Sequence, residues 1–240
     1  MKNGGSAAAG RIPILWPSPD GDNATEPWAK PVSRPRWRGR LHQAAFFASI
    51  PAGLSLVVVS PSLAARAAAA VYAMSLSAMY ATSAAFHRID WGPPARRWMR
   101  RVDHSMIFVL IAGSYTPFAL LGLSPPWSTV VLGVVWGGAA LGILVRLLSE
   151  ELGVLPGTLY LVLGWIGALV LPFAADHLTG VQIGLMVGGG LCYTIGAILF
   201  WLNRPVLRPQ VFGYHEVWHV LVVGGSASHY LLILLLVLQS

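Results

Sequence analysis

The sequence predicts an all-α integral membrane protein: a seven-transmembrane helix bundle with its N-terminus in the cytoplasm and its C-terminus outside. Of its 240 residues, 55% are hydrophobic and only 10% are charged, whereas a soluble domain carries about 25% charged residues. The mean hydropathy is +0.64. Windows of roughly 20 apolar residues, long enough to cross a bilayer as helices, recur at residues 41–60, 64–87, 104–123, 127–148, 156–175, 180–202 and 213–238.

Residues that break helices separate most of these windows. Proline and glycine end a helical pattern because proline lacks a backbone donor and glycine is conformationally free. The connections are short, and the breaks are Ser60-Pro61, Gly92-Pro93-Pro94, Ser124-Pro125-Pro126, Leu155-Pro156-Gly157 and Arg204-Pro205.

Small residues recur at helical spacing in two of the windows. They are expected to let neighbouring helices approach closely in the membrane. These residues are Gly133, Gly137, Gly138 and Gly142 in the fourth window, and Gly184 and Gly188 in the sixth. Whether they serve contacts within one chain or between chains is open, and so is the oligomeric state.

The distribution of basic residues predicts the orientation. Cytoplasmic segments of membrane proteins are enriched in Lys and Arg. With the N-terminus inside, 15 of the 16 basic residues lie on the cytoplasmic side and Arg66 alone lies outside. The net charge of +7 is thereby explained by topology, and we expect no nucleic-acid partner. We expect the protein in the plasma membrane, which for a bacterium is the inner membrane.

The chain divides into two parts. Residues 1–40 are rich in Pro, Gly, Ala and Arg and show no apolar helical pattern, so we expect a disordered, basic cytosolic tail. Residues 41–240 form the seven-span membrane domain. The single cysteine, Cys192, excludes a cysteine cluster, so any metal site must use His, Asp or Glu.

Two histidines at the start of the last window suggest a metal site. His215 and His219 are four residues apart, so both lie on one face of a helix and can bind one ion. Ionisable residues inside a membrane are rare and are usually functional. The intervening residue, Glu216, completes the His-Glu-x-x-His pattern of zinc proteases, in which the Glu is the general base. Because no acidic residue follows Glu216 to serve as a third ligand, a protease is the weaker interpretation.

Three helices are expected to bring polar residues to the same membrane depth. With the predicted orientation, Ser83 and His87 end the second span, Asp103 begins the third, and the histidine pair begins the seventh, all at the cytoplasmic side. Three imidazoles and a water make a catalytic zinc site, so His87, His215 and His219 are the predicted ligands of Zn²⁺. Asp103 would hold or deprotonate the water, and Ser83 would hydrogen-bond the substrate. Alternatively, Asp103 is a helix N-cap and Ser83 bonds to a helical carbonyl.

The loop expected between the second and third spans combines arginine with tryptophan. Residues 88–101 contain five arginines together with Trp91 and Trp98. Such a segment suits the anionic headgroups of the inner leaflet, with the aromatic rings as anchors. Alternatively, its positive charge serves only to set the orientation of the chain in the membrane.

Several ordered motifs resemble the hemolysin III family, the bacterial branch of the progestin and adipoQ receptor (PAQR) group. They are Ser83-x-x-x-His87, Arg101-Val102-Asp103-His104-Ser105 leading to Ser114-Tyr115-Thr116-Pro117, and Gly213-Tyr214-His215-Glu216-x-x-His219. The resemblance implies seven spans and a zinc ion near the cytosolic face, held by the three histidines, with Asp103 and Ser83 as functional residues. It also implies kinship with alkaline ceramidases, and links to cytolysis and to membrane homeostasis. Of the family's first-span signature, only His42 remains.

Three functions are compatible with these observations. The first is a zinc-dependent, ceramidase-like hydrolase of a lipid amide or ester, with a membrane lipid as its substrate. The second is a non-catalytic membrane sensor or receptor in which zinc is structural. The third is a pore-forming cytolysin of the hemolysin type. The sequence does not name the substrate or ligand.

Overall fold

The computed structural model describes residues 34–148, 155–174, 178–208 and 210–240, and within them every regular element is a helix. The predicted tail therefore lies largely outside the described residues. The helices are α1 (Arg40–Val59), α2 (Leu63–Arg88), α3 (Pro93–Gly122), α4 (Trp127–Leu148), α5 (Leu155–Gly164), α6 (Ile166–Ala174), α7 (Gly180–Trp201) and α8 (Tyr214–Gln239).

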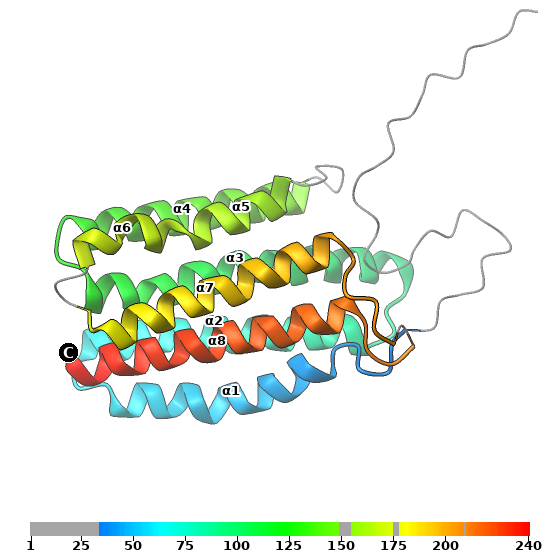
Figure 1. The fold of residues 1–240 in the computed structure, drawn as a ribbon, viewed down its shortest axis with the longest axis horizontal. Coiled ribbons are helices and arrows are strands. Elements are labelled where there is room, and N and C mark those ends of the chain that lie inside the picture. The colour runs from blue at the N-terminus through cyan, green and yellow to red at the C-terminus, as the bar shows by residue number, and fades with distance from the viewer. Residues whose placement is uncertain (1–33, 149–154, 175–177, 209) are drawn as a thin grey trace, which may run out of the picture.

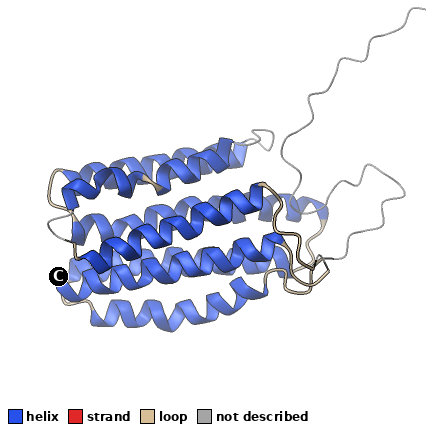
Figure 2. Cartoon of the chain, in the orientation of Figure 1, coloured by secondary structure: helices blue, strands red, loops and turns tan. Residues whose placement is uncertain are grey.

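The helices run side by side along one direction, with the connections at the two ends of the bundle (Figures 1 and 2). Consecutive helices pack together, as α1 does on α2, α2 on α3, α3 on α4 and α7 on α8. The last helix also contacts α1, α2 and α3, which closes the bundle. The ends of α2 and α7 and the starts of α1 and α8 consequently lie at the same end (Figure 1).

The all-α membrane fold is confirmed, and six helical segments are long and apolar enough to cross a membrane among the described residues. The remaining predicted span, residues 64–87, corresponds to α2, which is rich in Ala and Ser and has 12 buried residues. A helix surrounded by α1, α3 and α8 faces protein more than lipid, so it needs fewer large apolar side chains. The count of seven spans therefore stays a prediction.

The fifth predicted span is interrupted near its middle, between α5 and α6. Broken backbone inside a membrane must find hydrogen-bond partners within the protein. The hydroxyl of Tyr115 on α3 supplies them, because it donates to the carbonyl of Gly164 over 2.7 Å and accepts from the amide of Gly167.

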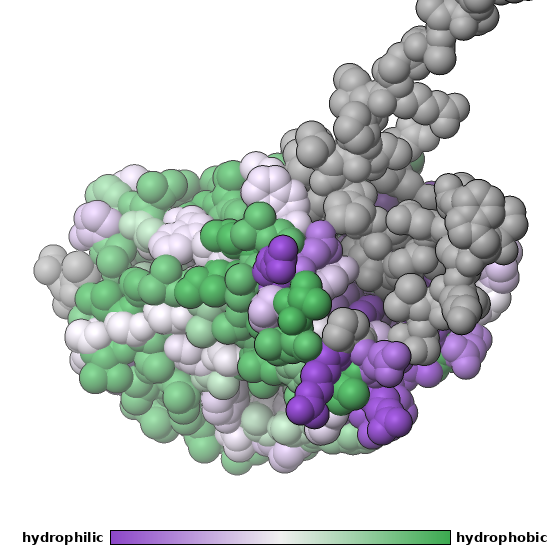
Figure 3. Space-filling model, turned by 45° about the vertical axis from the view of Figure 1, so that its right-hand side comes forward, coloured by the Kyte–Doolittle hydropathy of each residue, from purple (hydrophilic) through white to green (hydrophobic). Residues whose placement is uncertain are grey.

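The surface of the bundle matches a membrane-embedded protein. Hydrophobic residues cover its sides, and hydrophilic residues gather at the end where α1 and α8 begin (Figure 3). Large apolar side chains such as Val58 and Leu169 are each 75% exposed, which suits contact with lipid. The protein is thus a multi-pass membrane protein.

The third helix begins earlier than the apolar window predicts. Its first residue is Pro93, so residues 93–101 are helical and do not belong to a loop. The reason is local: Gly92 precedes two prolines, and proline at the first helical position is pre-organised for a helix. Asp103 therefore lies well inside α3, which excludes the N-cap role considered above.

The chain entering α1 crosses the end of the bundle and is fastened there. The amides of Arg36 and Trp37 donate to the carbonyls of Gln210 and Val211. The guanidinium of Arg38 donates through Nε to Oε1 of Glu216 over 2.6 Å, and the Glu216 side chain is 0% exposed. We call residues 34–39 the entry segment.

Only some of the small residues mark close helix contacts. A Cβ added at Gly138 would overlap Leu163, and one added at Gly142 would overlap the ring of Phe108, whereas Gly133 and Gly137 have nothing within 4 Å. In α7 the tight contacts are at Gly189 and Gly196 and not at the predicted Gly184 and Gly188. Spacing alone does not show which face of a helix meets a neighbour.

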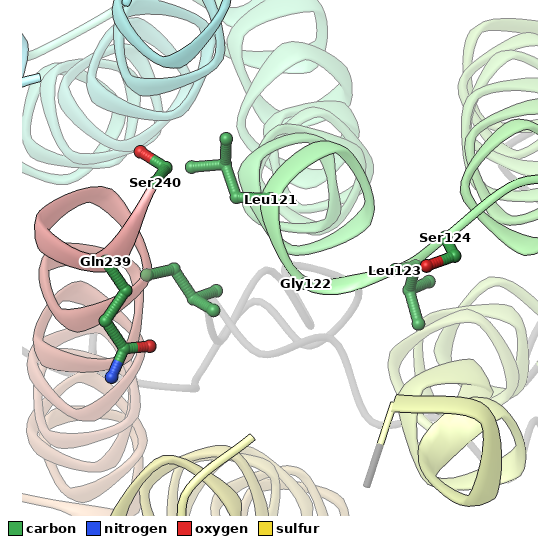
Figure 4. Close-up of a pocket in the computed structure, with 7 residues that line it drawn as sticks. Leu121, Gly122, Leu123, Ser124, Gln239 and Ser240 are labelled. Atoms are coloured by element: carbon green, nitrogen blue, oxygen red, sulfur yellow. The ribbon is translucent and has the colours of Figure 1, made fainter. Parts of the chain in front are cut away.

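A cavity of about 220 Å³ lies at the opposite end of the bundle. It is bounded by the end of α3 and the end of α8 (Figure 4). Gln182 lies nearby and donates to Gln239, one of the lining residues, over 2.8 Å. This cavity is far along the bundle from the histidine pair at the start of α8.

We expect Gly142→Val to destabilise the protein and Gly133→Val to leave it unchanged or slightly more stable. Both changes remove a helical glycine, but only the first forces side-chain atoms into Phe108, which is 0% exposed. Overpacking of this kind costs about 1–3 kcal/mol. The melting temperatures of the purified proteins in detergent would show the difference. Equal shifts for the two variants would contradict the packing of α4 on α3.

Arg38→Ala should destabilise the protein by about 3–5 kcal/mol, because it leaves the buried carboxylate of Glu216 without its cation. Arg34→Ala is the control, since its partner Asp90 is 95% exposed and surface ion pairs contribute little. Adding Glu216→Gln to Arg38→Ala should recover most of the loss by removing the buried charge. Denaturant unfolding in detergent measures all three, and a double variant no more stable than Arg38→Ala would argue against this account.

Candidate metal centre

Three histidine side chains meet at the end of the bundle where α8 begins. His87 lies in the last turn of α2, and His215 and His219 lie in the first two turns of α8. All three are buried, with 6%, 5% and 2% of their surfaces exposed. One ring nitrogen of each lies within 4.8 Å of the others. The four-residue spacing places His215 and His219 on one face of α8. The packing of α2 against α8 brings His87 next to them.

The donor set has the chemistry of a metal site. Nε2 of His87 and Nε2 of His215 are 3.1 Å apart, close to the separation of roughly 3.3 Å between two nitrogens bound to one tetrahedral zinc ion. The Nδ1 atoms of His215 and His219 are buried and have no hydrogen-bond partner among the described residues. One nitrogen from each of the three imidazoles lies close enough to the others for the group to hold a single cation. The three histidines could therefore form a metal site.

The glutamate between the two α8 histidines is engaged elsewhere. Oε2 of Glu216 accepts the amide of Gly213 over 2.7 Å, which caps the start of α8, and Oε1 accepts from Arg38. Neither oxygen is therefore available to act on a water at the metal. This geometry argues against the protease interpretation, which needs a free carboxylate as general base.

Ser83 contacts the group of His87, His215 and His219, which we call the histidine cluster, through a fourth histidine, His42. Its Oγ lies 2.8 Å from Nδ1 of His42 on α1. The ring of His42 stacks on the ring of His219, with centroids 3.7 Å apart and planes inclined by 14°. The sequence alone suggested only a supporting role for His42 and did not show which residues it contacts. The available signal was its place at the start of the first span, at the same end as the other histidines.

His104, the residue after Asp103, contacts α4 and α5. His104 contacts Nη2 of Arg146 through Nδ1, and its carbonyl accepts from Tyr160 over 2.9 Å. Asp103 is half-buried and close enough to Tyr160 for an electrostatic interaction. Its carboxylate is not one of the grouped ligand atoms of the three histidines. Its predicted role with a bound water stays a prediction.

The remaining histidine of α8 is separate from the cluster. Nε2 of His229 lies 3.3 Å from the carbonyl of Met186, and its ring meets the edge of Tyr193. His229 lies ten residues beyond His219 on the same helix, which is about 15 Å along the axis. It is a polar contact between α7 and α8.

Comparison with known proteins identifies relatives in bacteria and animals. The family model described as "Haemolysin-III related" matches residues 31–230. Hemolysin-3 of Bacillus cereus is 32% identical over 197 residues, which cover 80% of this chain and 86% of that protein. A hemolysin-3 homolog of Bacillus subtilis is 31% identical over 68% of this chain and 74% of its own length. The human monocyte to macrophage differentiation factor is 30% identical over 67% of this chain and 66% of its own.

The match to the family model covers the helices that carry the cluster, including His87, His215 and His219. The bacterial relatives agree with the predicted location in a bacterial inner membrane. The resemblance stated from the motifs is confirmed, and the chain belongs to the haemolysin III-related family.

Proposed function

We propose that this protein is a zinc-dependent hydrolase of a lipid amide or ester that acts in membrane homeostasis. The observation that carries the proposal is the set of three buried imidazoles contributed by α2 and α8, with no carboxylate among the grouped ligand atoms of the described residues. Neutral nitrogen ligands leave the full charge of the ion to act on a substrate, and three protein ligands leave a position open.

The apolar surroundings favour a lipid substrate. The cluster is buried at one end of a bundle whose sides are covered with hydrophobic residues (Figure 3). A substrate that already lies in the bilayer reaches such a site without leaving an apolar phase, whereas a water-soluble substrate would have to be desolvated. A ceramide-like amide or an ester lipid fits this requirement.

Each predicted site residue has a part in the reaction. When bound by the three histidines, a zinc ion acts as a Lewis acid and makes water nucleophilic near neutral pH. Asp103 accepts the proton that is released on attack at the carbonyl carbon, and returns it to the leaving amine or alcohol. The hydroxyl of Ser83 donates a hydrogen bond to the carbonyl oxygen as negative charge develops there.

The basic end of the bundle holds the protein at a negatively charged leaflet. The first turns of α3 carry four arginines, and the guanidinium of Arg101 lies 5.1 Å from the ring centroid of Trp98. Arginines at this level attract anionic headgroups, and the tryptophan suits the interface between headgroups and acyl chains. With the positive-inside rule, this end faces the cytoplasm.

We expect the purified protein to contain about one zinc ion per chain, as three converging imidazoles predict. His215→Ala/His219→Ala should reduce the zinc content at least tenfold, because two of the three ligands are lost. His229→Ala is the matched control, since it removes a histidine from the same helix outside the cluster. Elemental analysis after dialysis measures the content. Equal, negligible zinc in all three proteins would refute the metal site.

Asp103→Asn should lower the turnover of a lipid amide by about 100-fold or more while the zinc content stays at the wild-type level, because a general base contributes roughly 10²–10⁴-fold to a rate. The measurement is release of fatty acid from a fluorescent ceramide analogue by protein in liposomes. If wild type and Asp103→Asn are both inactive on amide and ester lipids yet keep zinc, the metal is structural and the protein is a sensor or receptor instead of a hydrolase.

A further inference from the structure

We propose that His42 is a positioning residue of the candidate metal centre, holding the ring of His219 by stacking and the hydroxyl of Ser83 by a hydrogen bond. The inference rests on the proposed function, because it assigns His42 a role toward zinc and substrate. The His-Glu-x-x-His pattern does not include this residue, and the family's first-span signature assigns it no role in the site.

The orientation of the His219 ring depends on the ring of His42. A metal-ligating histidine usually donates its second ring nitrogen to an acceptor, which fixes the plane of the ring. Nδ1 of His219 has no such partner among the described residues. Instead the ring of His42 lies almost parallel to it, with centroids 3.7 Å apart. The plane of His219 is therefore held by the face of a second ring.

His42 is itself held from several sides, as a positioning residue must be. It is 3% exposed. Nδ1 contacts Ser83, and the edge of Tyr80 meets the ring at a centroid distance of 5.1 Å and an angle of 60°. The entry segment fastens the start of α1 through the ion pair of Arg38 with Glu216. The ring that covers His219 thus has little freedom to move.

The direction of the hydrogen bond between His42 and Ser83 depends on which ring nitrogen of His42 carries the proton. Nε2 of His42 is buried and has no partner among the described residues. If its proton were on Nε2, a buried N–H would make no hydrogen bond of ordinary geometry among the described residues, which is rare in proteins. If the proton is on Nδ1, that nitrogen donates to Oγ of Ser83 and only a lone pair on Nε2 is left unused. The second arrangement is favoured.

The direction of that bond decides what Ser83 can do. A serine hydroxyl has a single proton, and a hydroxyl that donated to His42 could not donate to a substrate. With His42 as donor, the proton of Ser83 stays available for the carbonyl oxygen of a lipid. By donating to Ser83, His42 therefore leaves the serine hydroxyl free to donate to the substrate, as the proposed reaction needs.

Two substitutions separate the two contacts. His42→Phe keeps an aromatic ring over His219 but cannot donate to Ser83. His42→Leu loses both the ring and the donor. Ser49→Ala is the matched control: it removes a 2.8 Å hydrogen bond between α1 and Ser77 of α2, away from the histidines. The melting temperature of each variant without metal shows whether it folds.

Metal binding tests the stacking contact. The protein is loaded with Co²⁺, whose visible absorption reports the geometry of its ligands, and the rate of metal release to a chelator is measured. His42→Phe and Ser49→Ala should match wild type in spectrum and rate. His42→Leu should release metal at least tenfold faster, as expected when the support of a ligand is lost, with an altered spectrum. A wild-type spectrum and release rate in His42→Leu would overturn the proposal.

Turnover of the fluorescent ceramide analogue tests the hydrogen bond. His42→Phe and Ser83→Ala should each lower kcat about tenfold or more with little change in KM, and the double variant should be no slower than Ser83→Ala. Wild-type kcat in His42→Phe, or a double variant whose loss is the product of the two single losses, would overturn the proposal. If wild type binds no metal, the proposed function itself fails, so the two failures are distinguishable.

Discussion

The histidine cluster depends on the close packing of the entry segment across the ends of α2 and α8. Gly39 has a φ of 75°, in the left-handed region where glycine is favoured. A Cβ at Gly39 would come within 2.7 Å of the Cβ of His87. The next residue back, Arg38, reaches Glu216 at the start of α8. One short stretch therefore contacts both helices that carry the ligands and then turns directly into α1 with His42.

This arrangement explains why a charged pair is buried beside the cluster. An isolated carboxylate at Glu216 would be costly to bury, but Arg38 and the amide of Gly213 satisfy both of its oxygens. The same carboxylate caps α8, and the first turns of α8 carry His215 and His219. Fixing the start of this helix fixes the position of both ligands. The glutamate thus acts on the site through the backbone of α8.

The helices and the grouping of the three histidines could be predicted because their signals are local or follow from topology. Apolar windows and proline or glycine breaks place each helix to within a few residues, except where Gly92 and Pro93 start α3 early. A spacing of four residues places His215 and His219 on one face. The placement of His87 at the same side of the membrane follows once the ends of successive spans are assigned to the two sides. None of these steps requires the packing to be known.

The rest depends on contacts between residues far apart in the sequence. Arg38 and Glu216 are 178 residues apart, and no pattern in either segment specifies the pairing. The stacking of His42 on His219 depends on how α1 lies against α8, and helical periodicity does not determine this. The glycines of α4 also differ in their contacts: Gly142 is at a tight contact and Gly133 is not, although both belong to one repeat.

The number of ligands separates a catalytic from a structural role for the metal. A structural zinc site is closed by four protein ligands, whereas a catalytic site keeps one position for water or substrate. Within the part of the chain that the structure describes, the candidate group contains three histidines. Two neighbouring side chains are otherwise engaged, since His42 presents its ring face to His219 and Glu216 pairs with Arg38. A three-histidine group, which would leave a position for water or substrate, therefore supports the proposed hydrolase more than a sensor with structural zinc.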